Sequence, residues 1–268
     1  MVVQHNLRAM NSNRMLGLTS AGQAKSTEKL SSGYKINRAA DDAAGLAISE
    51  KMRRQVRGLT KAVSNAQDGI SCVQTAEGAL GEVHDMLQRM NELAVQSANG
   101  TNMSTDRNYL DKEVQALMSE INRVADTTTF NEQNLLKGSF NVNLQVGSEE
   151  GNKISLSITA MNCSGLSLSG DIKSASSASG FIGTVKTALE KVSAQRSDLG
   201  AIQNRLEHTI NNLNNVVENT TSAESQIRDT DMATEMVKYS NNNILAQAGT
   251  AMLAQANQAN QNVLSLLG

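Results

Sequence analysis

An apolar stripe in the N-terminal half constrains the fold of this chain more than any other feature. From Ile48 to Ala94, apolar residues recur at spacings of three and four without a slip. They are Ile48, Met52, Val56, Leu59, Ala62, Ala66, Ile70, Val73, Ala76, Leu80, Val83, Leu87, Met90 and Ala94. This spacing lines up one face of an α-helix. At a rise of about 1.5 Å per residue, it predicts a helix of roughly 70 Å, several times the usual length.

The composition permits such long helices. A chain of 268 residues would ordinarily contain about 13 prolines at the usual ~5%, yet this one contains none. It also has no tryptophan, three phenylalanines and three tyrosines, which excludes a large aromatic core. Because the 39% apolar content is rich in alanine, we expect thin seams between helices and an elongated molecule.

Two further stripes predict helices on either side of the middle of the chain. The first follows the turn residues Asn99 and Gly100 and consists of Leu110, Val114, Leu117, Ile121 and Val124. The second consists of Val185, Leu189, Val192, Leu199, Ile202, Leu206, Ile210, Leu213 and Val217. Since the turn at Asn99 and Gly100 is short, we expect the first of these helices to return antiparallel against the long one.

The middle of the chain changes to a period of two. Apolar and polar residues alternate over residues 140–146 and again over 154–158, and a polar, glycine-containing connector at 147–152 separates them. This pattern predicts a β-hairpin. Residues 162–183 are rich in serine and glycine and only weakly patterned, so we expect an exposed excursion there.

Both ends of the chain are also patterned as helices. A weak stripe begins at Leu7 and Met10, and the C-terminal stripe consists of Leu245, Ala248, Met252, Ala256, Ala259, Val263 and Leu266. Two such faces need partners, and the simplest partners are each other and neighbouring copies of the chain. Polar segments at 31–42 and 219–222 predict linkers, and the acidic pairs Asp41 with Asp42 and Asp229 with Asp231 are expected to cap the helices that follow. The predicted fold is mainly α: an elongated, hairpin-shaped helical bundle with long coiled-coil-like helices and a small β-hairpin region.

Charge and chemistry narrow the function to association. The net charge of −2 argues against a nucleic-acid partner, and no apolar stretch is long enough to span a bilayer. Residues 1–61 carry +7 and the remainder −9, a polarity that suits a head-to-tail polymer, although solvated charge on helix surfaces is the simpler interpretation. Catalytic and nucleotide-binding motifs are absent, and Cys72 and Cys163 lack metal-site spacing. We therefore predict no enzyme, no metal and no cofactor.

Five long segments resemble bacterial flagellins, in the order that the family has them. They are KLSSGYKINRAADDAAGLAISEKM (29–52), NAQDGISCVQTAEGAL (65–80), LQRMNELAVQSANG (87–100), LGAIQNRLEHTINNL (199–213) and ILAQAGTAMLAQANQANQNVLSLL (244–267). The resemblance covers nearly everything outside residues 139–183. It implies a structural subunit that polymerises through its terminal and central helices into the bacterial flagellar filament, for motility.

The resemblance also implies a domain layout for a short flagellin with little or no outer variable domain. The inner, D0-like domain would comprise the N-terminal helix with its linker (1–41) and the C-terminal linker and helix (222–268). The central, D1-like domain would comprise residues 42–138 and 184–221, with the β-hairpin and a short variable tip at 139–183. Flagellins are extracellular and leave through the flagellar export apparatus without a cleaved signal peptide, so we expect the same here.

Partners follow from the same resemblance. Besides itself, the chain would bind the flagellar export chaperone through its C-terminal helices (229–268), the filament cap and hook-junction proteins, a host Toll-like receptor and cytosolic flagellin sensors, but no nucleic acid and no membrane. The predicted polymerisation and chaperone seam is Leu245, Ala248, Met252, Ala256, Ala259, Val263 and Leu266. The predicted receptor-facing residues are Gln88, Arg89, Leu93, Asn99 and Glu113. The segment matching the one that cytosolic sensors recognise contains Val263, Leu264, Leu266 and Leu267.

Two departures from the family pattern leave the strength of receptor signalling open. Asn91 stands where many receptor-activating flagellins have arginine, and Gly268 stands where arginine is frequent. Two other functions remain as alternatives. A hook-filament junction protein would share the terminal seams, and a secreted helical effector or adhesin would act as a monomer.

Overall fold

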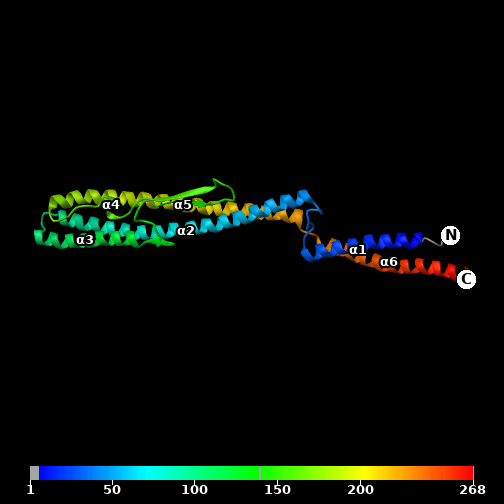
Figure 1. Cartoon of the computed structure of the whole chain (residues 1–268). Coiled ribbons are helices and arrows are strands. Elements are labelled where there is room, and N and C mark those ends of the chain that lie inside the picture. The colour runs from blue at the N-terminus through cyan, green and yellow to red at the C-terminus, as the bar shows by residue number, and fades with distance from the viewer. Residues whose placement is uncertain (1–5, 139, 268) are drawn as a thin grey trace. The chain divides into compact units, whose positions relative to one another are not determined.

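Long helices dominate the computed structural model, which describes residues 6–138 and 140–267, with side chains as far as residue 258. The helices are α1 (Leu7–Ser32), α2 (Ala43–Ala98), α3 (Ser104–Thr127), α4 (Cys163–Leu166), α5 (Ala175–Arg228) and α6 (Met232–Leu267) (Figure 1). Two small antiparallel strand pairs lie between α3 and α4: β1 (Thr129–Phe130) with β2 (Gln133–Asn134), and β3 (Phe140–Gln145) with β4 (Lys153–Ile158). The predicted mainly α fold with long helices and a small β-hairpin is confirmed.

The chain divides into two compact units. Unit 1 contains Met1–Val56 and Glu218–Gly268, and unit 2 contains Arg57–Val217. Helix α5 continues through residues 219–222, so the linker expected there does not interrupt the helix. The break comes instead between Arg228 and Met232, where Asp231 caps α6 by accepting hydrogen bonds from the N–H groups of Ala233 (3.0 Å) and Thr234 (3.3 Å).

The core of unit 2 lies where the predicted stripes of α2, α3 and α5 meet. Its fully buried members include Leu80, Leu87 and Met90 from α2, Val114 and Ile121 from α3, and Val185, Val192 and Leu199 from α5. Cys72 is buried among them as a small apolar residue. The period-of-3.6 pattern therefore identified the buried faces of these three helices correctly.

The β3–β4 hairpin packs against the same helices. Its register pairs Val142 with Leu156, and the inward residues Leu156 and Ile158 are fully buried. The Asn65 side chain on α2 donates a hydrogen bond to the carbonyl of Gln145 (3.1 Å). A Cβ at Gly69 would lie 2.5 Å from Leu144 Cδ1, so the absence of a side chain on α2 allows the hairpin its close approach.

The prediction of an exposed excursion at 162–183 holds only in part, because buried residues recur along a segment that is otherwise largely exposed. Cys163, Leu166, Leu168, Ile172 and Phe181 are buried, and α5 already begins at Ala175. The backbone at Ile172 is held on both sides: its N–H donates to Asp111 Oδ1 (3.1 Å), and its carbonyl accepts from the Ser97 hydroxyl (2.5 Å). Apolar residues scattered among serines and glycines thus pack the segment against the core. The side chains of Asp111 and Ser97 form the hydrogen bonds that its buried backbone groups need.

Candidate assembly surface

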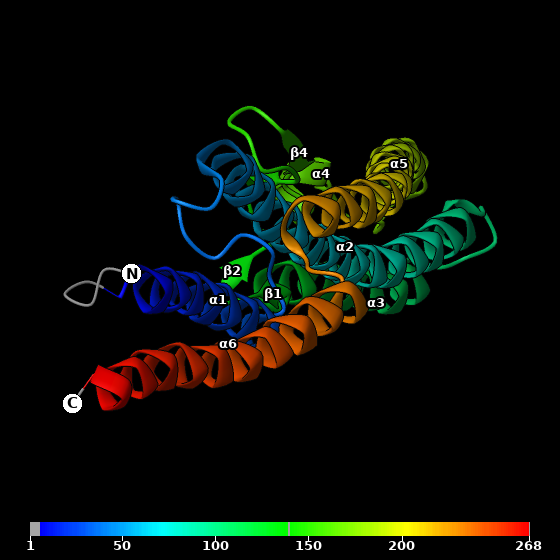
Figure 2. The same cartoon turned by 90° about the vertical axis from the view of Figure 1, so that its right-hand side faces the viewer.

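Helices α1 and α6 pair antiparallel within unit 1, side by side in both views (Figures 1 and 2). The Asn6 side chain donates a hydrogen bond to the carbonyl of Ala256 (3.0 Å). Farther along, a Cβ at Gly249 would lie 3.3 Å from Leu16 Cδ1, and a Cβ at Gly22 would lie 3.2 Å from Asn242 Nδ2. Small residues therefore let the two helices approach closely.

The residues that face each other across this pair repeat at spacings of three and four, which is the coiled-coil pattern. We call them the α1–α6 seam. On α1 they are Ala9, Ser12, Leu16, Thr19, Gln23, Ser26 and Leu30, and on α6 they are Glu235, Tyr239, Asn242, Ala246, Gly249, Leu253 and Ala256. Most are small or polar, so the pairing removes little apolar surface from water, and each Å² contributes only about 25 cal/mol.

One carboxylate is buried within the seam. Glu235 is 5% exposed, and Ser26 opposite it is 4% exposed. Burial disfavours the charged form of Glu235, but hydrogen bonds from Ser26 and Lys238 outweigh that effect and lower its pKa. The Lys238 Nζ lies 3.3 Å from Glu235 Oε2. The hydrogen bond from Ser26 to Glu235 is thus a buried polar contact between α1 and α6.

The C-terminal stripe predicted from the sequence mostly faces away from α1. Leu245 and Met252 are 57% and 62% exposed, and Ala248 is exposed as well. Only Ala256 of the described residues in that stripe belongs to the α1–α6 seam. The side chains of Ala259, Val263, Leu264, Leu266 and Leu267 lie outside the described residues. The stripe is therefore a second row on α6 that the single chain leaves uncovered.

Further large apolar side chains are exposed on both helices. On α1 these are Leu7, Met10, Met15 and Leu18, and on α6 they include Met232, Met236, Val237 and Ile244. Together with Leu245, Ala248 and Met252 we call these residues the outer apolar surface. Monomeric proteins rarely leave so much apolar side chain on the surface without a partner. This surface is the candidate functional site.

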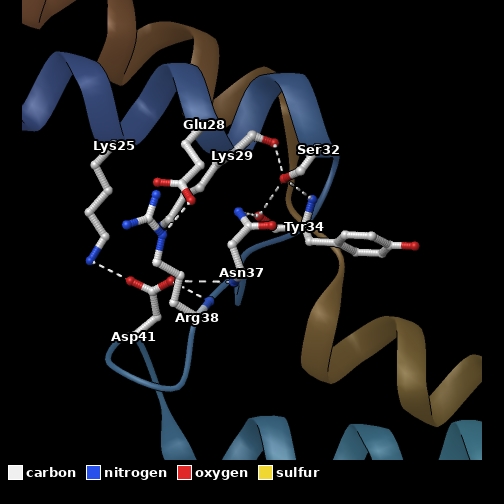
Figure 3. Close-up of polar contacts among 8 residues, drawn as sticks. All are labelled: Lys25, Glu28, Lys29, Ser32, Tyr34, Asn37, Arg38 and Asp41. Atoms are coloured by element: carbon white, nitrogen blue, oxygen red, sulfur yellow. Dashed lines mark hydrogen bonds and ion pairs between the residues drawn. The ribbon is translucent and has the colours of Figure 1, made fainter.

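The connection from α1 to α2 is held by a set of polar contacts (Figure 3). Asp41 accepts hydrogen bonds from the backbone N–H groups of Asn37 (3.3 Å) and Arg38 (3.1 Å), and Lys25 on α1 lies 2.9 Å from its other oxygen. The hydrogen bond from Lys25, followed by those two backbone donors, lowers the pKa of Asp41 to about 2. Arg38 pairs with Glu28 on α1 at 2.9 Å. The loop between α1 and α2 is therefore held against α1.

A second set of contacts joins this loop to the segment before α6. The N–H of Lys35 donates to the carbonyl of Arg228 (2.6 Å), and the N–H of Thr230 donates to the carbonyl of Gly33 (3.0 Å). The Arg228 guanidinium lies 4.5 Å from the centre of the Tyr34 ring, a cation–π distance. The predicted cap of α2 is confirmed, since Asp42 accepts from the N–H of Gly45 (2.9 Å). These contacts hold the start of α6 beside the end of α1.

The predicted receptor-facing residues separate into an exposed group and a buried one. Gln88, Arg89, Asn99 and Glu113 are exposed, and Arg89 Nε lies 2.9 Å from Glu113 Oε1, which brings α2 and α3 together. Leu93 is 1% exposed and packs in the core of unit 2. The expectation that Leu93 faces a receptor does not fit this buried position.

Two kinds of site are not found in the part of the chain that the structure describes. There, no three His, Cys, Asp or Glu side chains are grouped so that they could hold a metal ion. Among the described residues, no helix combines the length and apolarity needed to cross a membrane.

Comparison with known proteins assigns the family. The model of the bacterial flagellin N-terminal helical region matches residues 3–141, and that of the C-terminal helical region matches residues 182–267. The chain belongs to the bacterial flagellin family. Flagellins are structural proteins, so this flagellin is a filament subunit and not an enzyme.

Individual relatives cover the whole flagellin. A flagellin of Halalkalibacterium halodurans is 54% identical over 271 residues, and the flagellar filament 31.3 kDa core protein of Treponema maltophilum is 48% identical over 285 residues. Both alignments span 100% of this chain and 100% of the relative. A solved structure from Vibrio parahaemolyticus, provisionally named a flagellar hook-associated protein, has a TM-score of 0.60 at 14% identity and covers 70% of this chain and 100% of its own. That last likeness shows a shared fold alone.

Proposed function

We propose that this flagellin polymerises through its outer apolar surface, with neighbouring copies covering the face of α1 and α6 that the single chain leaves exposed. The observation that carries the proposal is the division of α6 into two rows. The row that faces α1 carries mostly small or polar residues and is at least partly buried, whereas Leu245 and Met252 in the other row are large, apolar and exposed. A second copy is the favoured occupant because a relative that aligns over the full chain is named a filament core protein. Assembly would then complete the burial that the monomer lacks.

Seeded growth tests this function. Purified chain added to short filament seeds should extend them into long filaments, which electron microscopy and sedimentation detect. A chain that binds the seed ends without elongating them would support the hook-filament junction alternative. A chain that stays in the supernatant and leaves the seeds unchanged would support a monomeric effector or adhesin.

The same exposed surface is the reason to propose partners that bind the subunit before it assembles. Residues 229–268 would be covered by the export chaperone, because an exposed apolar row needs shielding until the subunit reaches its site of assembly. The chain would leave the cell through the flagellar export apparatus without a cleaved signal peptide, and the filament cap and hook-junction proteins would meet the same terminal helices. The cytosolic-sensor segment at Val263, Leu264, Leu266 and Leu267 stays a prediction.

A host Toll-like receptor is proposed to bind unit 2 at Gln88, Arg89, Asn99 and Glu113. Arg89 is the residue with the largest expected effect, because its guanidinium is exposed and suited to charge-assisted hydrogen bonds. Replacement of Arg89 by alanine should weaken receptor binding about tenfold in a titration with the purified ectodomain. Arg123→Ala is the matched control, since Arg123 is also an exposed, ion-paired arginine, on α3. Equal affinity of the two variants would remove Arg89 from the proposed site.

A further inference from the structure

Exposed methionines are concentrated in unit 1. Met10, Met15, Met232, Met236 and Met252 are between 47% and 63% exposed, and all of them lie on α1 or α6. We call them the terminal methionines. All five belong to the outer apolar surface, which the proposed function buries in the filament.

The methionines of unit 2 differ from these in exposure or in position. Met90 and Met161 are 0% and 2% exposed and lie in its core. Met103, in the turn before α3, is 72% exposed. Met90 and Met161 as shielded methionines, and Met103 as an exposed methionine of unit 2, can therefore serve as internal references.

We propose that the terminal methionines are an oxidation site that controls assembly: peroxide converts them to sulfoxides in the free subunit and so blocks polymerisation, whereas the assembled filament shields them. The inference rests on the proposed function, because it requires that neighbouring copies bury these side chains. The oxidant is a two-electron oxidant of the peroxide class.

Oxidation of methionine by a peroxide transfers one oxygen atom to the sulfur. The thioether sulfur attacks one peroxide oxygen, the O–O bond breaks, and an S–O bond forms. The sulfur loses two electrons and the peroxide is reduced. The second oxygen leaves as hydroxide and becomes water by taking the proton of the oxygen that was transferred to sulfur. The product is a polar sulfoxide in place of an apolar thioether. A polar group that enters an apolar interface without a hydrogen-bond partner opposes burial, so the modified subunit loses affinity for the growing end.

Cysteine oxidation does not provide a competing route. Cys72 and Cys163 are 5% and 7% exposed, and burial raises the pKa of both thiols. Because the thiolate is the form that peroxide attacks, both cysteines are poor targets in the folded chain. Among the residues that the structure describes, the exposed sulfur atoms of α1 and α6 are therefore those of the terminal methionines.

The test compares free subunits and filaments treated with hydrogen peroxide. Peptide mass spectrometry should find sulfoxide at the terminal methionines and at Met103 in the free chain, and at Met90 in neither sample. In the filament the terminal methionines should be oxidised at least about tenfold more slowly than in the free chain. Oxidised subunits should need about tenfold more protein for seeded growth, and reduction by methionine sulfoxide reductase should restore growth. Equal oxidation of the terminal methionines in free and assembled chain would overturn the proposal.

Two variants separate this inference from the proposed function. The quintuple Met→Leu variant at the terminal methionines nearly conserves side-chain volume, so it should polymerise and stay competent after peroxide treatment. Met103→Leu should remain as sensitive as the unmodified chain. Oxidised native subunits that carry the sulfoxides and still polymerise normally would refute the oxidation site and leave the assembly surface intact. Failure of untreated native subunits to extend seeds would refute both.

Discussion

Replacing Leu245 and Met252 together with aspartate should abolish filament growth while the chain stays folded. Both side chains are more than half exposed in the single chain, so their loss removes little intramolecular packing. In the proposed filament, each aspartate would be buried without a partner, at an effective cost of several kcal/mol per ion. That cost corresponds to a reduction of assembly affinity by more than about 1,000-fold. Light scattering with seeds measures growth, and circular dichroism verifies that the helices remain.

The control for this variant places the same charges elsewhere on α6. Gln247 and Gln258 are exposed polar residues that project from another side of the helix. The double replacement Gln247→Asp and Gln258→Asp therefore adds the same two carboxylates without charging the row of Leu245 and Met252. Filament growth should be reduced far less in this control. Equal growth of both variants would show that the row is not buried on assembly.

The helices of this flagellin were predictable from sequence because their apolar spacing is regular, but the face that α6 turns toward α1 was not. Most residues of the α1–α6 seam are small or polar, and its few large apolar members, Leu16, Leu30 and Leu253, are too widely spaced to stand out in a search for apolar periodicity. The row with Leu245 and Met252 has the stronger apolar pattern in the sequence, yet it remains exposed in the single chain. If neighbouring copies cover that row as proposed, the strongest apolar pattern at this terminus belongs to the intermolecular contact, and the smaller residues belong to the intramolecular one.

Residues 162–183 escaped prediction for a related reason. Ile172 is isolated among polar residues, and no periodicity marks it as buried, whereas Phe181 extends the apolar stripe of α5 that was expected to begin only at Val185. The position of Ile172 depends on long-range contacts, such as the hydrogen bond from its N–H to the Asp111 carboxylate on another helix. A window along the sequence contains no information about such a partner. The buried polar residues Ser97 and Asp111 are a signal of such a contact, but they are recognisable as partners only once α2 and α3 are placed.

Leu93 shows how a helix with more than one neighbour buries more than one row. The apolar stripe of α2 passes through Met90 and Ala94, and it leaves Leu93 to one side. The buried core around α2 includes α3, α5 and the segment with Leu166 and Ile172, so the buried face is wider than a single stripe. Sequence similarity to the family placed Leu93 at the receptor contact, whereas its burial gives it a role in packing.

Leu93→Ala should destabilise unit 2 by about 2–5 kcal/mol, because removal of a fully buried leucine side chain leaves a cavity that the core fills only in part. Val95→Ala is the matched control: Val95 lies two residues away on the same helix and is 54% exposed. Its replacement should change the free energy of unfolding by no more than about 0.5 kcal/mol. Urea unfolding of the monomer, followed by circular dichroism, measures both. Equal midpoints for the two variants would contradict the burial of Leu93.

This prediction also decides how a loss of receptor binding by a Leu93 variant should be interpreted. If Leu93→Ala lowers receptor affinity and stability together while Arg89→Ala lowers affinity alone, Leu93 acts by supporting the helix that presents Arg89. If Leu93→Ala lowers affinity with no change in the free energy of unfolding, its side chain must leave the core and contact the receptor directly. Measuring both quantities on the same preparations separates a packing residue from a contact residue on this surface.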